Sequence, residues 1–330
     1  MMTATTDAPG VTDTKSLTLV LTEATLLCGG VRSLRLESAD GSTLPSFTPG
    51  SHLVLDCGTT PQGMPRRNSY SMTGPELEPD HYCVSVQLDR GGRGGSRWIH
   101  DLKIGTSIRT SRPRSVFAPV LTARHHLLIA GGIGVTPILS HARAAAQWGR
   151  SFTVLYVWRG TDAAHLAELR ELCGSRLHVF SSRQELWAHL GPGLLKQPLG
   201  THLYTCGPSA MIDAVEGAAK AAGWPSARIH YERFGGVELD PGQPFTVALR
   251  GSGQEFDVPS GTSVLETLEQ HGITIPNLCR QGVCGECRIP VADGSIAHRD
   301  LYLTDEEKSR GTSMMACVSR AEGSRLELNL

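Results

Sequence analysis

The sequence predicts a multidomain fold in which an antiparallel β-barrel is followed by a doubly wound α/β domain with a parallel sheet and by a small cysteine-bearing domain. A length of 330 residues exceeds what one ordinary core holds. The first third contains short β-rich runs separated by Gly and Pro, whereas the middle alternates strands with helices. Four of the nine cysteines gather near the C-terminal end. These observations together predict three domains.

Composition excludes several classes of protein. With 40% hydrophobic and 19% charged residues, the chain should fold as a globular protein. A formal net charge of −1 argues against a nucleic-acid partner, and the best apolar run, 127–139, is too short to cross a bilayer. The N-terminus lacks the pattern of a signal peptide, and an odd number of cysteines disfavours a disulfide framework. We therefore expect a cytoplasmic protein without a membrane or nucleic-acid partner.

Charge is unevenly distributed along the chain. Residues 240–330 include 13 acidic and 8 basic residues, a net of −5, whereas residues 1–239 carry a net of +4. An acidic module is expected to dock on basic surfaces, because long-range attraction steers the encounter.

The expected elements follow the change in pattern along the chain. Barrel strands are expected at 16–27, 31–36, 52–56, 69–73, 81–88 and 107–110, with a short helix at 96–101. The middle should contain strands at 126–130, 152–158, 177–181, 202–206 and 228–233 and helices at 135–148, 163–172 and 210–222. Beyond a Gly- and Pro-bearing junction, a hairpin at 245–250 and 255–258 precedes a serine-capped helix at 263–271. The resulting limits are 1–15 for a disordered tail, 16–118 for the barrel, 119–234 for the α/β domain, 235–243 for a linker and 244–330 for the last domain.

The clustered cysteines have a diagnostic spacing. Cys279-x4-Cys284-x2-Cys287, followed by Cys317, is the spacing of plant-type [2Fe–2S] ferredoxins, in which four thiolates converge on two irons. Glycines in this loop allow tight turns and a close approach of backbone to sulfide. The alternative is structural zinc, which usually shows paired C-x2–4-C spacings. The upstream hairpin and helix match the β-grasp layout of a ferredoxin domain.

A second motif joins a strand to a helix through glycines. Gly131, Gly132 and Gly134 let backbone approach a ligand, and Pro137 fits the first helical turn, whose free N–H groups favour an anion. Further on, Cys206, Gly207 and Pro208 follow a later strand. This pair of motifs is similar to that of the ferredoxin–NADP⁺ reductase superfamily, and the resemblance implies a nicotinamide dinucleotide site.

Members of that superfamily carry a flavin on a preceding barrel, marked by Arg-x-Tyr-Ser. The chain has Arg66, Arg67, Asn68, Ser69, Tyr70 and Ser71, in which the nearer arginine, Arg67, lies one residue further from the tyrosine than in the usual motif. Either Arg67 reaches the flavin phosphate through a bulge or another donor replaces it. Ser71 is a candidate hydrogen-bond donor near the reactive flavin N5.

From about residue 16 the whole chain resembles the phthalate dioxygenase reductase family, whose flavin is FMN. The loop Arg93, Gly94, Gly95 and Ser96 matches the family's phosphate loop. The resemblance further implies that Ser85, Val86 and Gln87 flank the flavin ring, that Thr136 lies between flavin and nicotinamide, and that Phe234 sits near the ring. Cys206 is then a positioning residue, and Arg159 belongs to the nucleotide site, where it or Arg183 pairs with a 2′-phosphate that Asp162 would repel. The family mostly uses NADH, which we expect here.

The cofactors define the expected activity. Hydride should pass from nicotinamide to flavin, and single electrons should then pass through the cluster to an external acceptor. We expect a monomeric reductase whose partner is a terminal oxygenase, a Rieske non-haem iron enzyme acting on an aromatic acid or amine. A haem monooxygenase is an alternative acceptor. A second hypothesis is a stand-alone diaphorase or flavin reductase, which would not need the ferredoxin domain. A third is a binding or sensor protein whose cluster reports redox state, and such a protein should lack fast turnover with NADH.

Overall fold

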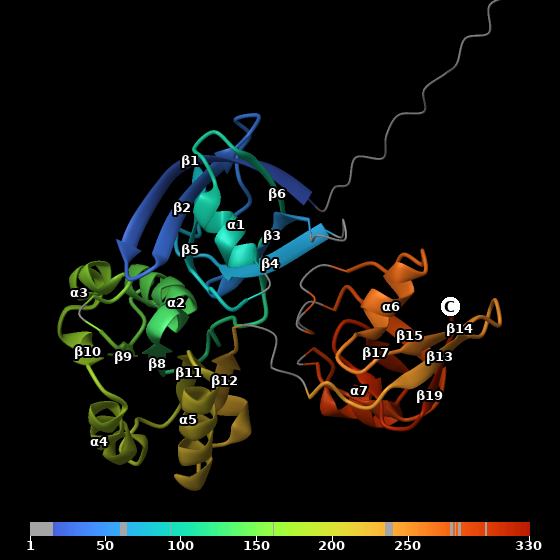
Figure 1. The fold of residues 1–330 in the computed structure, drawn as a ribbon. Helices are drawn as coiled ribbons and strands as arrows, with labels where there is room; N and C mark the ends of the chain where they lie inside the picture. Colours follow the sequence, from blue (N-terminus) through green and yellow to red (C-terminus); the bar gives the residue numbers. More distant parts are fainter. Residues whose placement is uncertain are drawn as a thin grey trace, which may run out of the picture.

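The computed structural model describes residues 16–59, 65–92, 94–160, 162–234, 240–277, 280, 282, 285–300 and 302–330. The chain forms an antiparallel barrel, a parallel five-stranded sheet and a mixed five-stranded sheet with a separate two-stranded ribbon (Figure 1). The three kinds of domain that the sequence predicts are therefore confirmed. The expected tail, 1–15, and residues 235–239 of the expected linker lie outside the described residues, and the domain limits stay predictions.

The barrel consists of seven strands and one helix. Its elements are β1 (Ser16–Cys28), β2 (Val31–Ser38), β3 (Ser51–Thr59), β4 (Pro65–Ser71), β5 (His81–Gln87), α1 (Gly95–Asp101), β6 (Ser107–Ser111) and β7 (Arg114–Ser115). The strand order is β4-β3-β6-β1-β2-β5, and an isolated bridge between Met72 and Val84 brings the two ends of that order together. Alternating residues such as Leu19, Leu21 and Leu34 are fully buried in the barrel core, as a period of two requires. Strand β4 begins four residues earlier than expected, so it includes the arginines that precede Tyr70.

The α/β domain is a doubly wound parallel sheet. Its strands are β8 (His125–Gly131), β9 (Phe152–Val157), β10 (Leu177–Phe180), β11 (Thr201–Cys206) and β12 (Ile229–Glu232). Its helices are α2 (Val135–Gln147), α3 (Leu166–Cys173), α4 (Arg183–Leu194) and α5 (Ser209–Ala221), with 3-10 turns at Gly132–Gly134, Gly174–Arg176 and Ser226–Arg228. The order β10-β9-β8-β11-β12 reverses direction at β8, and ligands of such sheets bind outside the strand ends at this point. Helix α4 was not expected from the sequence, because Pro192 and two glycines interrupt its pattern.

The third domain combines a mixed sheet with two short helices. Its elements are β13 (Phe245–Leu249), β14 (Glu255–Val258), α6 (Val264–Gln270), β15 (Arg288–Asp293), β16 (Ile296–Ala297), α7 (Asp305–Arg310), β17 (Ser313–Met315), β18 (Arg320–Ala321) and β19 (Arg325–Leu328). The expected serine cap of α6 is confirmed, because Ser263 and Glu266 form a reciprocal capping box. Leu265 and Leu268 of α6 pack against the sheet, which fixes the helix that supports the cysteine loop.

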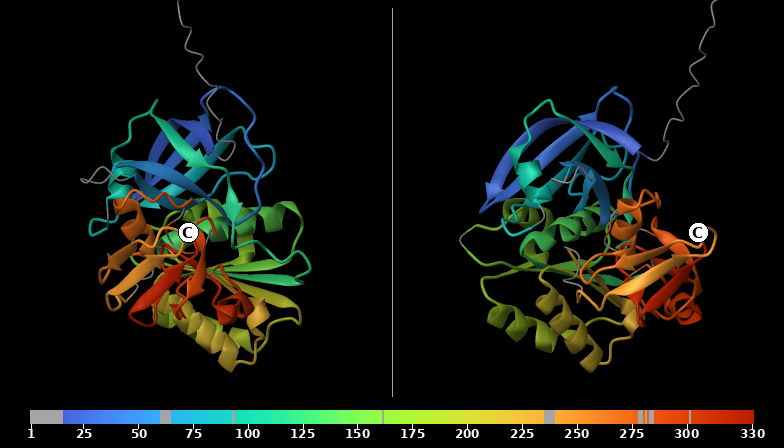
Figure 2. Two further views of the ribbon diagram at one scale, coloured as in Figure 1. Left: turned by 90° about the vertical axis from the view of Figure 1, so that its right-hand side faces the viewer. Right: turned by 45° about the vertical axis from the view of Figure 1, so that its right-hand side comes forward.

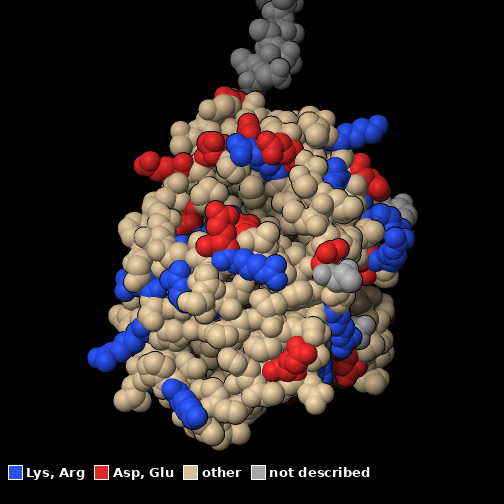
Figure 3. Space-filling model, turned by 90° about the vertical axis from the view of Figure 1, so that its left-hand side faces the viewer, with Lys and Arg blue, Asp and Glu red and all other residues tan. Residues whose placement is uncertain are grey.

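The domains lie close together. The third domain lies beside the α/β domain and beneath one side of the barrel in the different views (Figures 1 and 2). On the face formed by the barrel and the α/β domain, acidic and basic side chains are interspersed rather than gathered in one patch (Figure 3). Over the described residues, no helix is long and apolar enough to span a bilayer.

Candidate functional site

The two glycine motifs of the α/β domain pack directly against each other. Strands β8 and β11 are parallel neighbours whose register pairs Cys206 with Ala130, so the turns that follow them lie side by side. A Cβ atom on Gly134 would overlap the carbonyl group of Cys206, and one on Gly131 would lie 3.0 Å from Pro208. Glycine is therefore required at Gly134 by close approach of backbone, while at Gly131 the side chains of Met211 and Pro208 take up the space. This contact places the start of α2, with its free N–H groups, beside the second turn.

A pocket of about 370 Å³ opens at these turns. Residues from both predicted cofactor groups line it, namely Gly131, Gly132, Arg159, Pro208 and Gln87. Asp162 and Arg183 line the same pocket, so one acidic and two basic side chains share it. Pro137 and Thr136 are buried in the first turn of α2, where the Thr136 hydroxyl donates to the Ile133 carbonyl at 3.1 Å. The pocket has the glycine backbone and mixed charge suited to a dinucleotide.

A half-buried carboxylate, that of Glu232, lies where the barrel meets the end of β12. The Ser71 hydroxyl donates to the Glu232 carboxylate at 3.3 Å across this boundary. Burial raises the pKa of Glu232 to about 8, which exceeds the opposing effect of the Ser71 hydrogen bond. Cys206 is fully buried, and burial, followed by the nearby Glu232 charge, raises the pKa of its thiol. Glu232 is therefore neutral near pH 7, and Cys206 is an unreactive thiol, consistent with a positioning role.

Strand β4 directs alternate side chains to two different places. Arg66 and Asn68 point toward the glycine loop, since a Cβ on Gly94 would lie 3.4 Å from the Arg66 guanidinium carbon and one on Gly95 would overlap the Asn68 amide. Among the described residues, Nε of Arg66 and the Ser69 hydroxyl are buried without a hydrogen-bond partner. The orphaned Arg66 donor lies beside a glycine cradle and fits an oxyanion such as a phosphate, whereas Ser69 belongs to the alternate face of β4.

Arg67 points away from that loop. Its Nε pairs with Asp56 at 2.8 Å, and its Nη1 donates to the Asn277 carbonyl of the third domain at 3.3 Å. Arg67 thus lies at a domain contact, and Arg66 is the arginine that lies beside the glycine loop. Tyr70 contributes partly to the barrel core and accepts a hydrogen bond from the Asn68 amide at 3.2 Å.

The remaining residues predicted to bind the flavin lie in separate places on the barrel and at the end of the α/β domain. The Ser85 hydroxyl contacts His165 Nε2 at 2.9 Å, and the other ring nitrogen of His165 contacts Glu168, so this serine joins the barrel to α3. Val86 points into the barrel core, which leaves only its backbone for a ligand. Ser96 bonds the backbone of Asp89 and closes the glycine loop. Phe234 is 37% exposed, and Arg93 lies outside the described residues.

Two of the four predicted cluster ligands can be located. The thiols of Cys287 and Cys317 are buried, and their sulfur atoms lie 3.1 Å apart without forming a disulfide. Two thiols converging in this way fit ligands that share one metal ion. Cys279 and Cys284 lie outside the described residues. A Cβ on Gly285, in the same loop, would overlap the Tyr302 ring, so the glycine expected for a close turn is required.

Comparison with known proteins bears on all three domains. The model for the N-terminal domain of dimethylamine monooxygenase subunit DmmA-like proteins matches residues 106–229, and that for the 2Fe-2S iron-sulfur cluster binding domain matches 247–322. The heme-dependent oxidative N-demethylase beta subunit of Ectopseudomonas mendocina (strain ymp) is 41% identical over 88% of this chain and 91% of that protein. The vanillate O-demethylase oxidoreductase of Pseudomonas sp. (strain HR199 / DSM 7063) is 34% identical over 94% of this chain and 99% of that protein.

Two solved structures share the arrangement of the whole chain. Phthalate dioxygenase reductase, described as a modular structure for electron transfer from pyridine nucleotides to [2Fe–2S], is 33% identical with a TM-score of 0.74, over 96% of this chain and 98% of that one. The chain belongs to the phthalate dioxygenase reductase family. An intact type IV self-sufficient cytochrome P450 monooxygenase is also 33% identical, with a TM-score of 0.78, over 96% of this chain but only 41% of that one. The family reductase therefore corresponds to less than half of that P450 chain.

Membership in this family identifies the protein as an iron–sulfur flavoprotein oxidoreductase, the reductase component of an oxygenase system. Its 2Fe-2S domain contains the predicted Cys287 and Cys317. From the sequence a donor other than Arg67 was left open, and Arg66 stands next to Arg67 in the same motif. His165 and Glu232 were not expected as site residues. Glu232 had a detectable signal, because it ends a strand two residues before Phe234 and a carboxylate is costly to bury unless it is paired.

The contact between the two turns leads to a test. Gly134→Ala should weaken NADH binding, because the added methyl group collides with the Cys206 carbonyl and must push the turns apart at a cost of about 1–3 kcal/mol. Titration of the purified reductase with NADH would measure this. Gly217→Ala is the matched control, since it lies in α5 with nothing within 4 Å of the new Cβ. Equal affinity in both variants would show that the turns do not shape the site.

Proposed function

We propose that the reductase takes electrons in pairs from NADH at FMN and passes them singly through a [2Fe–2S] cluster to a terminal oxygenase. A bound flavin would supply two-electron acceptance of hydride from NADH, leaving NAD⁺, and a bound cluster, which holds one added electron, would pass the two electrons one after the other to the acceptor. The observation that carries the proposal is that β4 reaches all three regions, with Arg66 at the glycine loop, Arg67 at the third domain and Ser71 at the α/β domain.

The residues of each site have distinct roles in this proposal. The Arg66 guanidinium and the backbone of Gly94 and Gly95 hold the FMN phosphate. Gln87 and the backbone of Val86 border the ring, and Phe234 covers it. The nucleotide lies across Gly131, Gly132, Gly134, Gly207 and Pro208. Ser71 donates a hydrogen bond at the reacting edge, while Thr136 and Cys206 position the nicotinamide. The partly exposed Phe234 and the orphaned Arg66 nitrogen support the presence of a further group between the domains.

We propose a haem oxygenase that oxidises an amine as the acceptor, because the relative that is 41% identical is a heme-dependent oxidative N-demethylase subunit and one family model describes a dimethylamine monooxygenase subunit. A Rieske non-haem iron oxygenase is the second candidate, through the likeness to phthalate dioxygenase reductase and vanillate O-demethylase oxidoreductase. Substrate-dependent NADH oxidation with a purified haem N-demethylase or a Rieske oxygenase would decide between them. We also propose a monomeric reductase in the cytoplasm, where an odd number of cysteines is ordinary because a disulfide framework is not expected.

The cluster should lie on the only route to one-electron acceptors. Cys287→Ser should abolish NADH-dependent reduction of cytochrome c, because one iron loses a thiolate, while NADH still bleaches the flavin. Stopped-flow spectroscopy measures both steps. Cys83→Ser, which changes a cysteine of the barrel, should leave both steps intact. Undiminished cytochrome c reduction by Cys287→Ser would contradict the linear route.

Glu232 should give flavin reduction a pH dependence. Its pKa of about 8 lies above the usual value for glutamate, so the side chain is neutral below pH 8 and negative above it. Hydride brings negative charge to the adjacent site, so the rate of flavin reduction should fall as pH rises through about 8. Glu232→Gln should remove this inflection. Rapid mixing with NADH at several pH values measures it, and an identical pH profile in the variant would contradict the assignment.

Asp162 should determine the preference for NADH. Its carboxylate shares the nucleotide pocket with Arg159 and Arg183, and would repel a 2′-phosphate that the arginines attract. Asp162→Ser should therefore raise kcat/KM for NADPH with little change for NADH. Steady-state kinetics with both nucleotides is the measurement. If the ratio of the two kcat/KM values stays constant, selectivity arises elsewhere.

A further inference from the structure

We infer that two barrel arginines, Arg67 and Arg114, hold the third domain against the flavin barrel at Asn277 and Glu286, the residues that flank the cysteine loop. This orientation would let electrons pass from flavin to cluster within one chain. This inference rests on the proposed function, and it makes Arg67 a positioning residue between domains instead of a phosphate ligand. The Arg67 guanidinium donates to the Asn277 carbonyl at 3.3 Å, and Arg114 pairs with Glu286 at 2.7 Å.

The two contacts fall on opposite sides of the loop. Asn277 comes two residues before Cys279, whereas Glu286 directly precedes Cys287. Each arginine therefore contacts the third domain within two residues of a predicted cluster ligand. Contacts at two separate points restrict rotation as well as displacement of a loop, which a single ion pair would not do.

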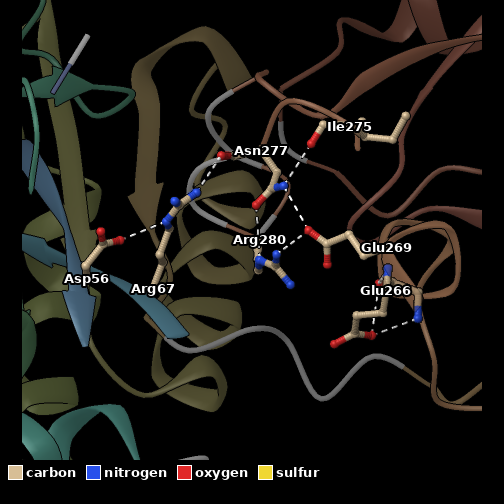
Figure 4. A network of polar contacts seen from close by, with 8 residues as sticks. Asp56, Arg67, Glu266, Glu269, Ile275, Asn277 and Arg280 are labelled. Carbon is tan, nitrogen blue, oxygen red and sulfur yellow. Dashed lines mark hydrogen bonds and ion pairs between the residues drawn. The ribbon is translucent and has the colours of Figure 1, made fainter. Parts of the chain in front are cut away.

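The barrel side of the Arg67 contact is fixed in direction. Arg67 Nε pairs with Asp56 of the neighbouring strand β3 at 2.8 Å, and the strand register places these residues opposite each other. The guanidinium group is planar, so fixing Nε also fixes the direction of the Nη1 donor. Asp56 thus aims Arg67 at the third domain (Figure 4).

Within the third domain, hydrogen bonds to Glu269 and Arg280 hold Asn277, the residue that Arg67 contacts. Asn277 donates through its amide to Glu269 of α6 at 3.1 Å and accepts from Arg280 Nε at 3.2 Å. Arg280 also pairs with Glu269 at 2.5 Å, which supports a left-handed backbone at Arg280, with φ of 54°. Figure 4 shows this network running from Asp56 through Arg67 to α6. The barrel therefore contacts a segment that the capped helix α6 already holds.

Charge complementarity supports the same contact. A cavity of about 200 Å³ lies at this boundary, lined by Arg67, Arg109 and Arg114 of the barrel and by Asp56 and Glu286. These three arginines face a domain region of net charge −5, whereas the preceding chain is net +4. Partly exposed ion pairs contribute little to stability, because water screens them. Such pairs affect the orientation of the third domain on the barrel more than the stability of the protein. The rate of electron transfer from flavin to cluster should therefore be sensitive to their loss.

The test separates flavin reduction from the step that follows it. In the full-length holoprotein, Arg67→Gln should retain FMN and be reduced by NADH at an unchanged rate, while electron transfer from flavin to cluster slows about tenfold. Arg67→Lys should restore little, because an ammonium group cannot pair with Asp56 and Asn277 in the same fork. Arg35→Gln is the matched control, since Arg35 is equally exposed in the barrel and ion-paired with Glu37.

A charge exchange tests the second contact independently of Arg67. Arg114→Glu should slow the same step, and Arg114→Glu combined with Glu286→Arg should recover much of the rate. Cluster electron paramagnetic resonance in each variant, after chemical reduction, reports whether the cluster itself is intact. Recovery in the double variant with an unchanged cluster signal supports the inference.

Two results would overturn it. One is loss of FMN from Arg67→Gln together with a normal rate of cluster reduction in molecules that keep FMN, which would make Arg67 a phosphate ligand. The other is a normal rate in both Arg67→Gln and Arg114→Glu, which would show that neither arginine positions the loop. Failure of NADH to reduce flavin in the unmodified protein would instead contradict the proposed function.

Discussion

Strand β4 is the part of the structure on which the other sites depend. Its even-numbered residues Arg66 and Asn68 face the glycine loop, Arg67 faces the third domain, and Ser71 at its end contacts Glu232 of the α/β domain. The alternation of side chains along a strand makes this possible within seven residues. A shift of one residue in the register between β4 and β3 would exchange the two faces of β4. The pairing of these strands therefore decides which side chain of β4 faces which site.

Close backbone contact and interdomain polar contact serve different purposes here. The glycine turns after β8 and β11 touch through backbone at Gly134 and Cys206, which shapes a nucleotide pocket that the barrel residue Gln87 also lines. The barrel meets the cysteine loop through arginines and carboxylates, which form a small and polar contact. Two such contacts at separate points orient the loop while contributing little to stability. The reductase therefore combines a backbone contact at the nucleotide turns with polar contacts that orient the cysteine loop.

The sequence predicted the three kinds of domain and most of their elements, because hydrophobic period and turn residues are local signals. It also predicted the nucleotide turns, since glycine there is required by contacts between parallel neighbours. Helix α4 was missed because Pro192 lies inside it. The contact of Arg67 with the third domain and the position of Glu232 beside Ser71 depend on which residues meet across domain boundaries. No periodicity along the chain encodes those contacts.

Electron transfer from flavin to cluster is tested most directly by an anaerobic titration of the holoprotein with NADH, followed by visible absorption and electron paramagnetic resonance. If the transfer occurs within the chain, NADH alone bleaches the flavin and also produces the signal of a reduced [2Fe–2S] cluster, with three electrons stored per chain. A cluster that stays oxidised in the presence of excess NADH, yet is reduced at once by dithionite, would contradict the claim that electrons pass from flavin to cluster inside this protein.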